Sequence, residues 1–280
     1  MALPTEYNRP ATLDDALRAA GQPGSIALAG GALTFTGVLL PYERVIDLQD
    51  VPELKILEAS PDHLRVGGAV TLAALLDAPG LPLVLKRALT RSLNPNLRNN
   101  TSVGESLCAP SPPREWLTAL LALGAVVDHR PGADPLQEPL EDFLAALWES
   151  GEPYRGVVVN VDIPLPGKRG ALGAAHVART PADPPIIDAA VSVTLGDDGL
   201  VSAAMAAIGG ASAEPVMVLG LLNLVGARLD EDTITQVAKP IASLVQPVAD
   251  YKGSADYRRE MARVCVRRAL LDCLGQLGIK

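Results

Sequence analysis

The stretch Ser25-Ile-Ala-Leu-Ala-Gly-Gly-Ala-Leu33 contains a short apolar run that leads into two consecutive glycines. An apolar run of this length bounded by glycines predicts a buried strand followed by a tight turn. Glycines at such a turn let the backbone approach a ligand closely, and a row of N–H groups can bind a phosphate. A double glycine after a strand is also typical of an ordinary turn, so both interpretations stay open here.

Residues on either side of this stretch complete a small α/β unit. Thr12 is followed three residues later by Asp15, an arrangement that caps the first turn of a helix, and a helix is predicted through Ala20. A second short strand is predicted over residues 44–48. The order helix, strand, turn, strand therefore predicts an α/β unit that ends near residue 57.

A second α/β pattern follows and leads to a linker. Strands are predicted over residues 64–68, 125–129 and 156–162, and helices over residues 71–76, 83–90 and 115–123. Residues 94–111 are polar and punctuated by proline, which predicts a long loop. Pro164-Leu-Pro-Gly-Lys-Arg-Gly170 has the composition of a linker. We therefore predict a first domain over residues 1–165, with subdomains at 1–57 and 58–165, and a second domain over residues 170–280.

The chain after the linker has a different pattern. Gly196-Asp-Asp-Gly199 lies between apolar runs at 188–195 and 200–208, which is a strong signal for an antiparallel hairpin. Helices are predicted over residues 215–225, 234–244 and 257–277. These patterns predict an α+β chain whose last domain is an antiparallel sheet with packed helices.

Composition argues against several classes of function. The 280 residues carry a net charge of −8 and no stripe of lysine and arginine, which disfavours binding to nucleic acid. No apolar run approaches the length of a membrane span, and the first ten residues lack the pattern of a signal peptide. A chain with few cysteines and no such pattern is expected in a reduced compartment, the cytoplasm.

No cluster of residues predicts a catalytic or metal site. Cys108, Cys265 and Cys273 include no CxxC pair, and the three histidines lie far apart along the chain. No Ser/His/Asp arrangement is conspicuous. We therefore expect neither a set of metal ligands nor a self-contained catalytic set in this chain.

Two motifs, in a fixed order, carry a resemblance to a known family. The first is Ala29-Gly-Gly-Ala-Leu-Thr34, and the second is Arg98-Asn-Asn-Thr-Ser-Val-Gly-Glu-Ser-Leu-Cys-Ala-Pro-Ser-Pro112. They resemble the motifs A-G-G-T-D-L and R-N-x-G-T-I-G-G-N-L-A-x-A-S-P of the FAD-binding medium subunit of molybdenum hydroxylases, the group of carbon monoxide dehydrogenase and xanthine dehydrogenase. The resemblance extends to the opening Tyr7-Asn-Arg-Pro10 and to a C-terminal pattern that includes Asp250 and Arg258.

The resemblance implies a fold, a cofactor and partners. The fold would be a two-subdomain FAD-binding domain of the PCMH type, followed by the C-terminal domain. FAD would lie between the subdomains, and electrons would pass to it from a [2Fe–2S] iron–sulfur subunit, itself supplied by a large molybdenum-cofactor subunit, and then to an acceptor such as NAD. A family lysine aligns with His176. The residues that the resemblance assigns to the cofactor are Ala29, Gly30, Gly31, Ala32, Leu33, Thr101, Ser102, Gly104, Glu105, Leu107, Glu115 and Asp183.

The chain departs from the family motifs where the pyrophosphate would bind. Ala32 and Leu33 replace a threonine and an aspartate, so backbone N–H groups would have to hold the phosphates. Thr101 and Glu105 replace glycines. Two like charges about 4 Å apart cost about 1 kcal/mol in water and about 4 kcal/mol at an effective dielectric constant of about 20. We therefore expect a Glu105 side chain that faces the phosphates to weaken FAD binding.

Three classes of function stay open at this point. The chain could be a redox subunit that carries FAD, a structural or assembly subunit of the same kind of complex without flavin, or a different flavin- or nucleotide-binding protein. The C-terminal pattern disfavours the third class. The first two classes share one fold, so the fold alone does not separate them.

Overall fold

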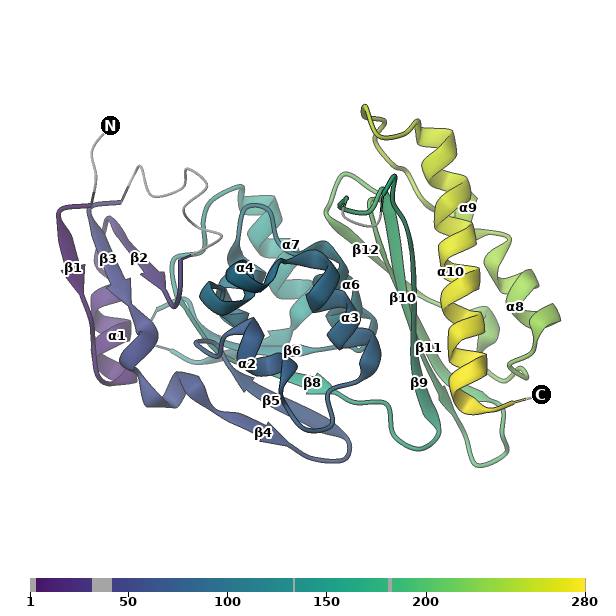
Figure 1. Cartoon of the computed structure of the whole chain (residues 1–280), viewed down its shortest axis with the longest axis horizontal. Coiled ribbons are helices and arrows are strands. Elements are labelled where there is room, and N and C mark those ends of the chain that lie inside the picture. The colour runs from purple at the N-terminus through teal and green to yellow at the C-terminus, as the bar shows by residue number, and fades with distance from the viewer. Residues whose placement is uncertain (1–3, 32–41, 133, 181–182, 280) are drawn as a thin grey trace. The chain divides into compact units, whose positions relative to one another are not determined.

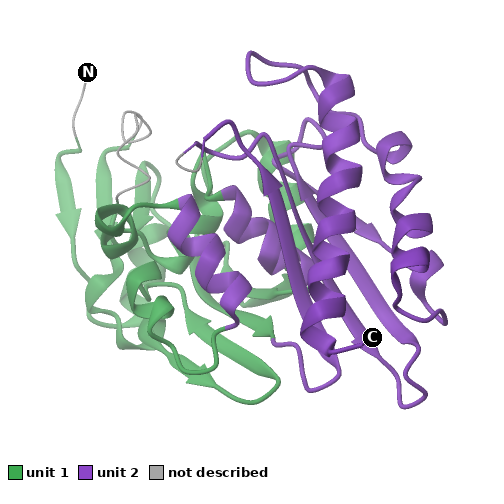
Figure 2. Cartoon of the chain, turned by 45° about the vertical axis from the view of Figure 1, so that its right-hand side comes forward, with its two compact units in different colours: residues 1–81, 93–113, 124–164 green, residues 82–92, 114–123, 165–280 purple. Residues whose placement is uncertain are grey.

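The computed structural model describes residues 4–31, 42–132, 134–180 and 183–279. The backbone falls into two compact units, and each is assembled from separate parts of the chain (Figure 2). Unit 1 takes residues 1–81, 93–113 and 124–164, and unit 2 takes residues 82–92, 114–123 and 165–280. Two short segments from the first half of the chain therefore belong to the same unit as its C-terminal part.

Unit 1 begins with a small parallel sheet. Strands β1 (Glu6–Asn8), β2 (Ser25–Leu28) and β3 (Arg44–Asp47) lie in the order β1-β3-β2, next to helix α1 (Leu13–Ala20) (Figure 1). The Thr12 hydroxyl accepts the Asp15 N–H at 3.2 Å and so caps α1 as expected. Ala16 and Ala19 of α1 pack with Ile46 in one buried cluster, which attaches the helix to the sheet.

The larger sheet of unit 1 is antiparallel. Strands β4 (Leu57–Ala59), β5 (His63–Gly67), β8 (Val157–Pro164), β6 (Val126–Arg130) and β7 (Leu136–Pro139) lie in that order. The helical elements of the same unit are η1 (Leu48–Asp50), η2 (Pro52–Lys55), α2 (Leu72–Leu76), α4 (Pro95–Asn100), α5 (Val103–Cys108) and α7 (Leu140–Ser150). Gly68 lies so close to the sheet that a Cβ there would be 1.9 Å from the Val158 carbonyl oxygen. Only glycine allows this approach.

The long loop predicted over residues 94–111 is wrong, because the segment folds into α4 and α5. Each helix has its own polar cap, since the Asn94 side chain accepts the Leu97 N–H at 2.9 Å and the Ser102 hydroxyl accepts the Glu105 N–H at 3.2 Å. Proline in the first turn is compatible with a helix because its missing N–H would have no partner there.

Unit 2 is built on one antiparallel sheet. Strands β9 (Gly170–Val177), β10 (Ile187–Leu195), β11 (Val201–Gly209) and β12 (Val216–Gly220) lie in the order β12-β11-β10-β9. Helices α3 (Leu83–Ser92) and α6 (Arg114–Ala122) lie on one face, and α8 (Glu231–Ala238), α9 (Ile241–Leu244) and α10 (Ala255–Leu277) on the other (Figure 2). The predicted hairpin at residues 196–199 is confirmed, because Thr194 pairs with Ala203 across it.

Strand β10 explains how both faces of this sheet are covered. Its residues Ala189 and Val191 join the buried cluster that includes Cys265 of α10. Residues of the other parity face α6, where the Ser192 hydroxyl donates to the Ala122 carbonyl. Successive side chains of a strand point to opposite faces, so one strand serves two layers.

Two helix predictions for unit 2 are wrong. Residues 215–225 form β12 and the short turn η3 (Leu222–Leu224), because Val216–Gly220 pairs with the edge of β11. The helix predicted over residues 234–244 is divided into α8 and α9, since Pro240 has no N–H to continue the hydrogen-bond ladder. The predicted fold class is nevertheless confirmed, with an α/β part made of two sheets followed by an antiparallel sheet with packed helices. In the described ranges, no helix is both long enough and apolar enough for a bilayer crossing.

Candidate functional site

The first motif forms a glycine turn at the end of β2. Gly30 has φ 146° and Gly31 has φ 82°, both in the region that favours glycine. A Cβ on Gly30 would lie 2.4 Å from the carbonyl oxygen of Asn100, the last residue of α4. The turn therefore presses against the start of the second motif, and Gly30 is required for that packing whether or not a ligand binds.

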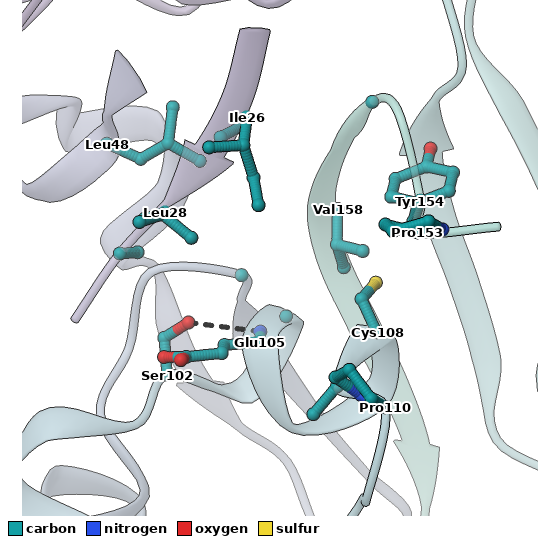
Figure 3. A pocket seen from close by; sticks show the side chains of 16 residues that line it. Ile26, Leu28, Leu48, Ser102, Glu105, Cys108, Pro110, Pro153, Tyr154 and Val158 are labelled. Carbon is teal, nitrogen blue, oxygen red and sulfur yellow. Dashed lines mark hydrogen bonds between the residues drawn. The ribbon is translucent and has the colours of Figure 1, made fainter. Parts of the chain in front are cut away.

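The Glu105 side chain connects the two motifs. Its Oε2 accepts a hydrogen bond from the Gly31 N–H at 3.0 Å, and the residue is only 9% exposed. Its own N–H donates to the Ser102 hydroxyl at 3.2 Å (Figure 3). We call Gly30, Gly31, Ser102, Gly104 and Glu105 the glycine cradle.

The backbone N–H groups of the second motif are used within the unit. The N–H of Val103 donates to the Val70 carbonyl at 2.8 Å, and the N–H of Gly104 donates to the Gly68 carbonyl at 2.9 Å. The N–H of Ser106 donates to the Ser102 carbonyl at 2.9 Å, and the Ser102 hydroxyl takes the N–H of Glu105. The N–H groups of residues 103–106 therefore all have acceptors in the folded chain.

A narrow cavity adjoins the cradle (Figure 3). Its volume is about 70 Å³, whereas pockets for small-molecule ligands run to roughly 300–1,000 Å³. Ser102, Gly104 and Glu105 line it together with apolar residues of β2 and β8, and its described lining includes no lysine or arginine. Glu105 therefore makes this cavity acidic, which disfavours an anionic ligand.

Cys108 and Tyr154 also line the cavity and were not predicted from the sequence. Burial, with a smaller contribution from the nearby Glu105 carboxylate, raises the pKa of the Cys108 thiol to about 12. The thiol thus stays protonated near neutral pH and is a poor nucleophile. No spacing in the sequence indicated this residue, because a lone cysteine carries no pattern.

A partly buried chain of polar side chains begins at Tyr154. Its hydroxyl lies 2.7 Å from Nδ1 of His129, whose Nε2 lies 2.8 Å from Oε1 of Glu138. Phe143 packs edge-on against the His129 ring, with ring centroids 4.8 Å apart. Burial raises the pKa of Tyr154, so its hydroxyl remains protonated. This chain ties β6, β7 and the loop before β8 together.

The residues that the resemblance assigns to the cofactor do not all lie together in the structure. Ala29, Gly30, Gly31, Ser102, Gly104 and Glu105 lie at or beside the cradle in unit 1. Thr101 and Leu107 are fully buried, and the Thr101 hydroxyl has no hydrogen-bond partner among the described residues. Ala32 and Leu33 lie outside the described residues. Glu115 and Asp183 belong to unit 2.

Glu115 is part of a second polar cluster, in unit 2. Its Oε1 lies 3.1 Å from Nε of Arg91 and 3.5 Å from Nδ1 of His176. Burial, and then the charge of Asp188, raises the pKa of Glu115, while burial and Arg91 lower the pKa of His176. Asp188 is in turn bound by Arg114 at 2.6 Å. A cavity of about 140 Å³ adjoins the cluster, whose charges largely pair with one another.

The cradle as it stands does not fit the pyrophosphate of FAD. The Gly31 N–H that would donate to a phosphate oxygen already donates to the Glu105 carboxylate. The N–H groups of residues 103–106 are also occupied. A pyrophosphate at this place would meet a buried negative charge, with no lysine or arginine among the described lining residues to offset it.

Two family models cover most of the chain. Residues 3–166 match the FAD binding domain in molybdopterin dehydrogenase, and residues 175–273 match the CO dehydrogenase flavoprotein C-terminal domain. The chain is 26% identical to the nicotine 6-hydroxylase medium subunit of Paenarthrobacter nicotinovorans, over 97% of this chain and 98% of that protein. It is 24% identical to the carbon monoxide dehydrogenase medium chain of Afipia carboxidovorans, over 95% of each.

Solved structures share the fold. A chain of quinoline 2-oxidoreductase from Pseudomonas putida 86 superposes with a TM-score of 0.83 at 24% identity, over 99% of this chain and all of that one. A chain of the Cu,Mo-CO dehydrogenase superposes with a TM-score of 0.81 at 22% identity, over 98% and 100% of the two chains. The first family model spans more than half of the residues, and the two models follow one another in the order of the two predicted domains. The chain therefore belongs to the molybdopterin dehydrogenase family of FAD-binding domain proteins, with the C-terminal domain of the CO dehydrogenase flavoproteins.

Proposed function

We propose that this chain is the medium subunit of a molybdenum hydroxylase complex and that its role there is structural. Its expected partners are an iron–sulfur subunit that carries [2Fe–2S] and a large subunit that carries the molybdenum cofactor. The end-to-end similarity to medium subunits of hydroxylase and dehydrogenase complexes supports the assignment. The place of the complex is the cytoplasm, where the free thiols of Cys108, Cys265 and Cys273 are stable.

One observation supports the structural role over the electron-transfer role that the sequence also left open. The Glu105 carboxylate accepts the Gly31 N–H, at the place where the family motifs would hold a phosphate. An electron path through FAD to an acceptor such as NAD would need the cradle to be free for that phosphate. The occupied cradle favours a subunit that joins the partners without holding flavin tightly.

The test is to purify the chain from its own organism through an affinity tag on its C-terminus. We expect two further subunits in the eluate, together with iron and molybdenum measured by elemental analysis, and little flavin released by acid. An untagged strain is the control for non-specific retention. Recovery of the chain alone, as a fully active oxidoreductase, would contradict the medium-subunit assignment. A complex with one FAD per chain would contradict only the structural role.

A further inference from the structure

We infer that the Glu105 carboxylate is a built-in anion of the glycine cradle: it occupies the phosphate position and lets unit 1 fold without a bound nucleotide. The inference takes from the proposed function only that the cradle corresponds to the flavin site of the family. It adds what the Glu105 carboxylate does for the fold of unit 1 when no nucleotide is bound.

The geometry of the carboxylate supports this role. Glu105 is anchored within one turn of α5, where its N–H is bound by the Ser102 hydroxyl, so its side chain starts from a fixed position. From there its Oε2 reaches the Gly31 N–H at 3.0 Å across 74 residues of sequence. A buried N–H without an acceptor is destabilising. The carboxylate therefore supplies to the turn what a phosphate oxygen supplies in a nucleotide complex.

The charge of the Glu105 carboxylate disfavours a phosphate in the same glycine cradle. The described lining of the adjoining cavity offers no cationic side chain, so an ionised Glu105 and a phosphate cannot share the cradle at low cost. The small volume acts in the same direction, because a cavity of about 70 Å³ leaves little room for a ligand beside the carboxylate. A ligand that displaced the Glu105 side chain would remove the acceptor of the Gly31 N–H, and the ligand would then have to accept that hydrogen bond itself.

The experiment compares the full-length chain with Glu105→Gly and Glu105→Gln by titration with FAD, followed by flavin fluorescence. Glu105→Gly removes charge and bulk, and we expect it to bind FAD roughly 5- to 1,000-fold more tightly than the unmodified chain. Glu105→Gln keeps an oxygen that can accept the Gly31 N–H, so its gain should be smaller. Glu58→Gln, a change of the same charge on the exposed strand β4, should leave the affinity unaltered.

A second measurement, made without any ligand, tests how the loss of the Glu105 carboxylate affects the fold. Hydrogen exchange of the segment 25–31 should be faster in Glu105→Gly than in the unmodified chain, because the Gly31 N–H loses its acceptor. Added FAD should slow it again in the variant only. If Glu105→Gly does not fold in the absence of FAD, the comparison rests on Glu105→Gln, which preserves the shape of the side chain.

Two results would overturn the inference. The first is FAD affinity of the unmodified chain equal to that of Glu105→Gly and Glu105→Gln. The second is unchanged exchange of the segment 25–31 in Glu105→Gly. Neither result bears on partner subunits, since co-purification of the complex tests the proposed function separately.

Discussion

In both units, glycines lie where two segments of backbone approach each other most closely. In unit 2, a Cβ on Gly173 of β9 would lie 2.0 Å from the Ala269 carbonyl oxygen of α10, a backbone atom that cannot give way alone. In unit 1, the same holds for Gly68 against Val158. The family glycines of the cradle belong partly to this group, because Gly30 is needed for packing against Asn100. Gly30 therefore serves the packing of unit 1 whether or not a phosphate binds beside it.

The change Gly173→Ala should lower the free energy of unfolding by roughly 1–3 kcal/mol, because α10 has to move away from β9. Gly275→Ala on α10 is the matched control, since a Cβ there meets nothing within 4 Å. Alanine in a helix is favoured over glycine by roughly 0.5–1 kcal/mol, so the control should be neutral or stabilising. Urea unfolding followed by circular dichroism measures both changes, and equal effects at the two glycines would refute the packing argument.

At the scale of elements, local signals were predictable from the sequence and tertiary pairings were not. Thr12 and the Gly196–Gly199 turn act within a few residues, so their patterns predicted α1 and the hairpin. Strand β9 is composed mostly of glycine and alanine, which have low strand propensity, and only its pairing with β10 makes it a strand. The helix predicted over residues 215–225 is wrong for the same reason, because pairing with the edge of β11 decides their structure.

The candidate site follows the same rule. The sequence indicated that Glu105 replaces a glycine in the second motif, and charge alone predicted a conflict with a phosphate. The contact of its carboxylate with Gly31 could not be predicted, because it depends on how β2 and α5 are placed in the fold. The resemblance assigns Thr101 and Leu107 to the cofactor, and this assignment stays a prediction; both side chains are fully buried in unit 1.

Helix α10 has a cap that can be tested alone. The Ser254 hydroxyl accepts the Tyr257 N–H at 3.2 Å, and the Arg258 guanidinium that follows bonds the Ile186 carbonyl at 2.8 Å. Ser254→Ala should cost about 0.5–2 kcal/mol of stability, whereas Ser254→Asp should retain most of it because aspartate also caps helices. Thermal unfolding of the three proteins measures this, and an Ser254→Asp variant as unstable as Ser254→Ala would argue against a capping role.

At the scale of the whole molecule, the chain passes between its units several times. Helices α3 and α6 come from the first half of the sequence but belong to unit 2, where α6 packs on the sheet that begins at residue 170. The domain boundary predicted at residues 165–170 stays a prediction. The compact units also divide the chain between residues 164 and 165, but they place α3 and α6, which come before that point, with the C-terminal part.

Cleavage at the exposed Lys168 or Arg169 tests this arrangement. Brief treatment with trypsin should give two pieces that still elute together from a sizing column, because α6 from the first piece lies on β10 from the second. A variant with both residues changed to alanine should resist that cut. Separation of the pieces in native buffer would show that α3 and α6 do not hold the sheet.

During protein synthesis, helix α6 is made well before the strands that cover it. Residues 116–122 of this helix are all buried in the finished fold, and strands β10 and β11 that cover it end at residues 195 and 209. A ribosome that adds about 5–20 residues per second needs on the order of ten seconds to deliver those strands. During that interval the nascent chain presents an apolar helix to its surroundings, so a chaperone that binds such segments would find its target here.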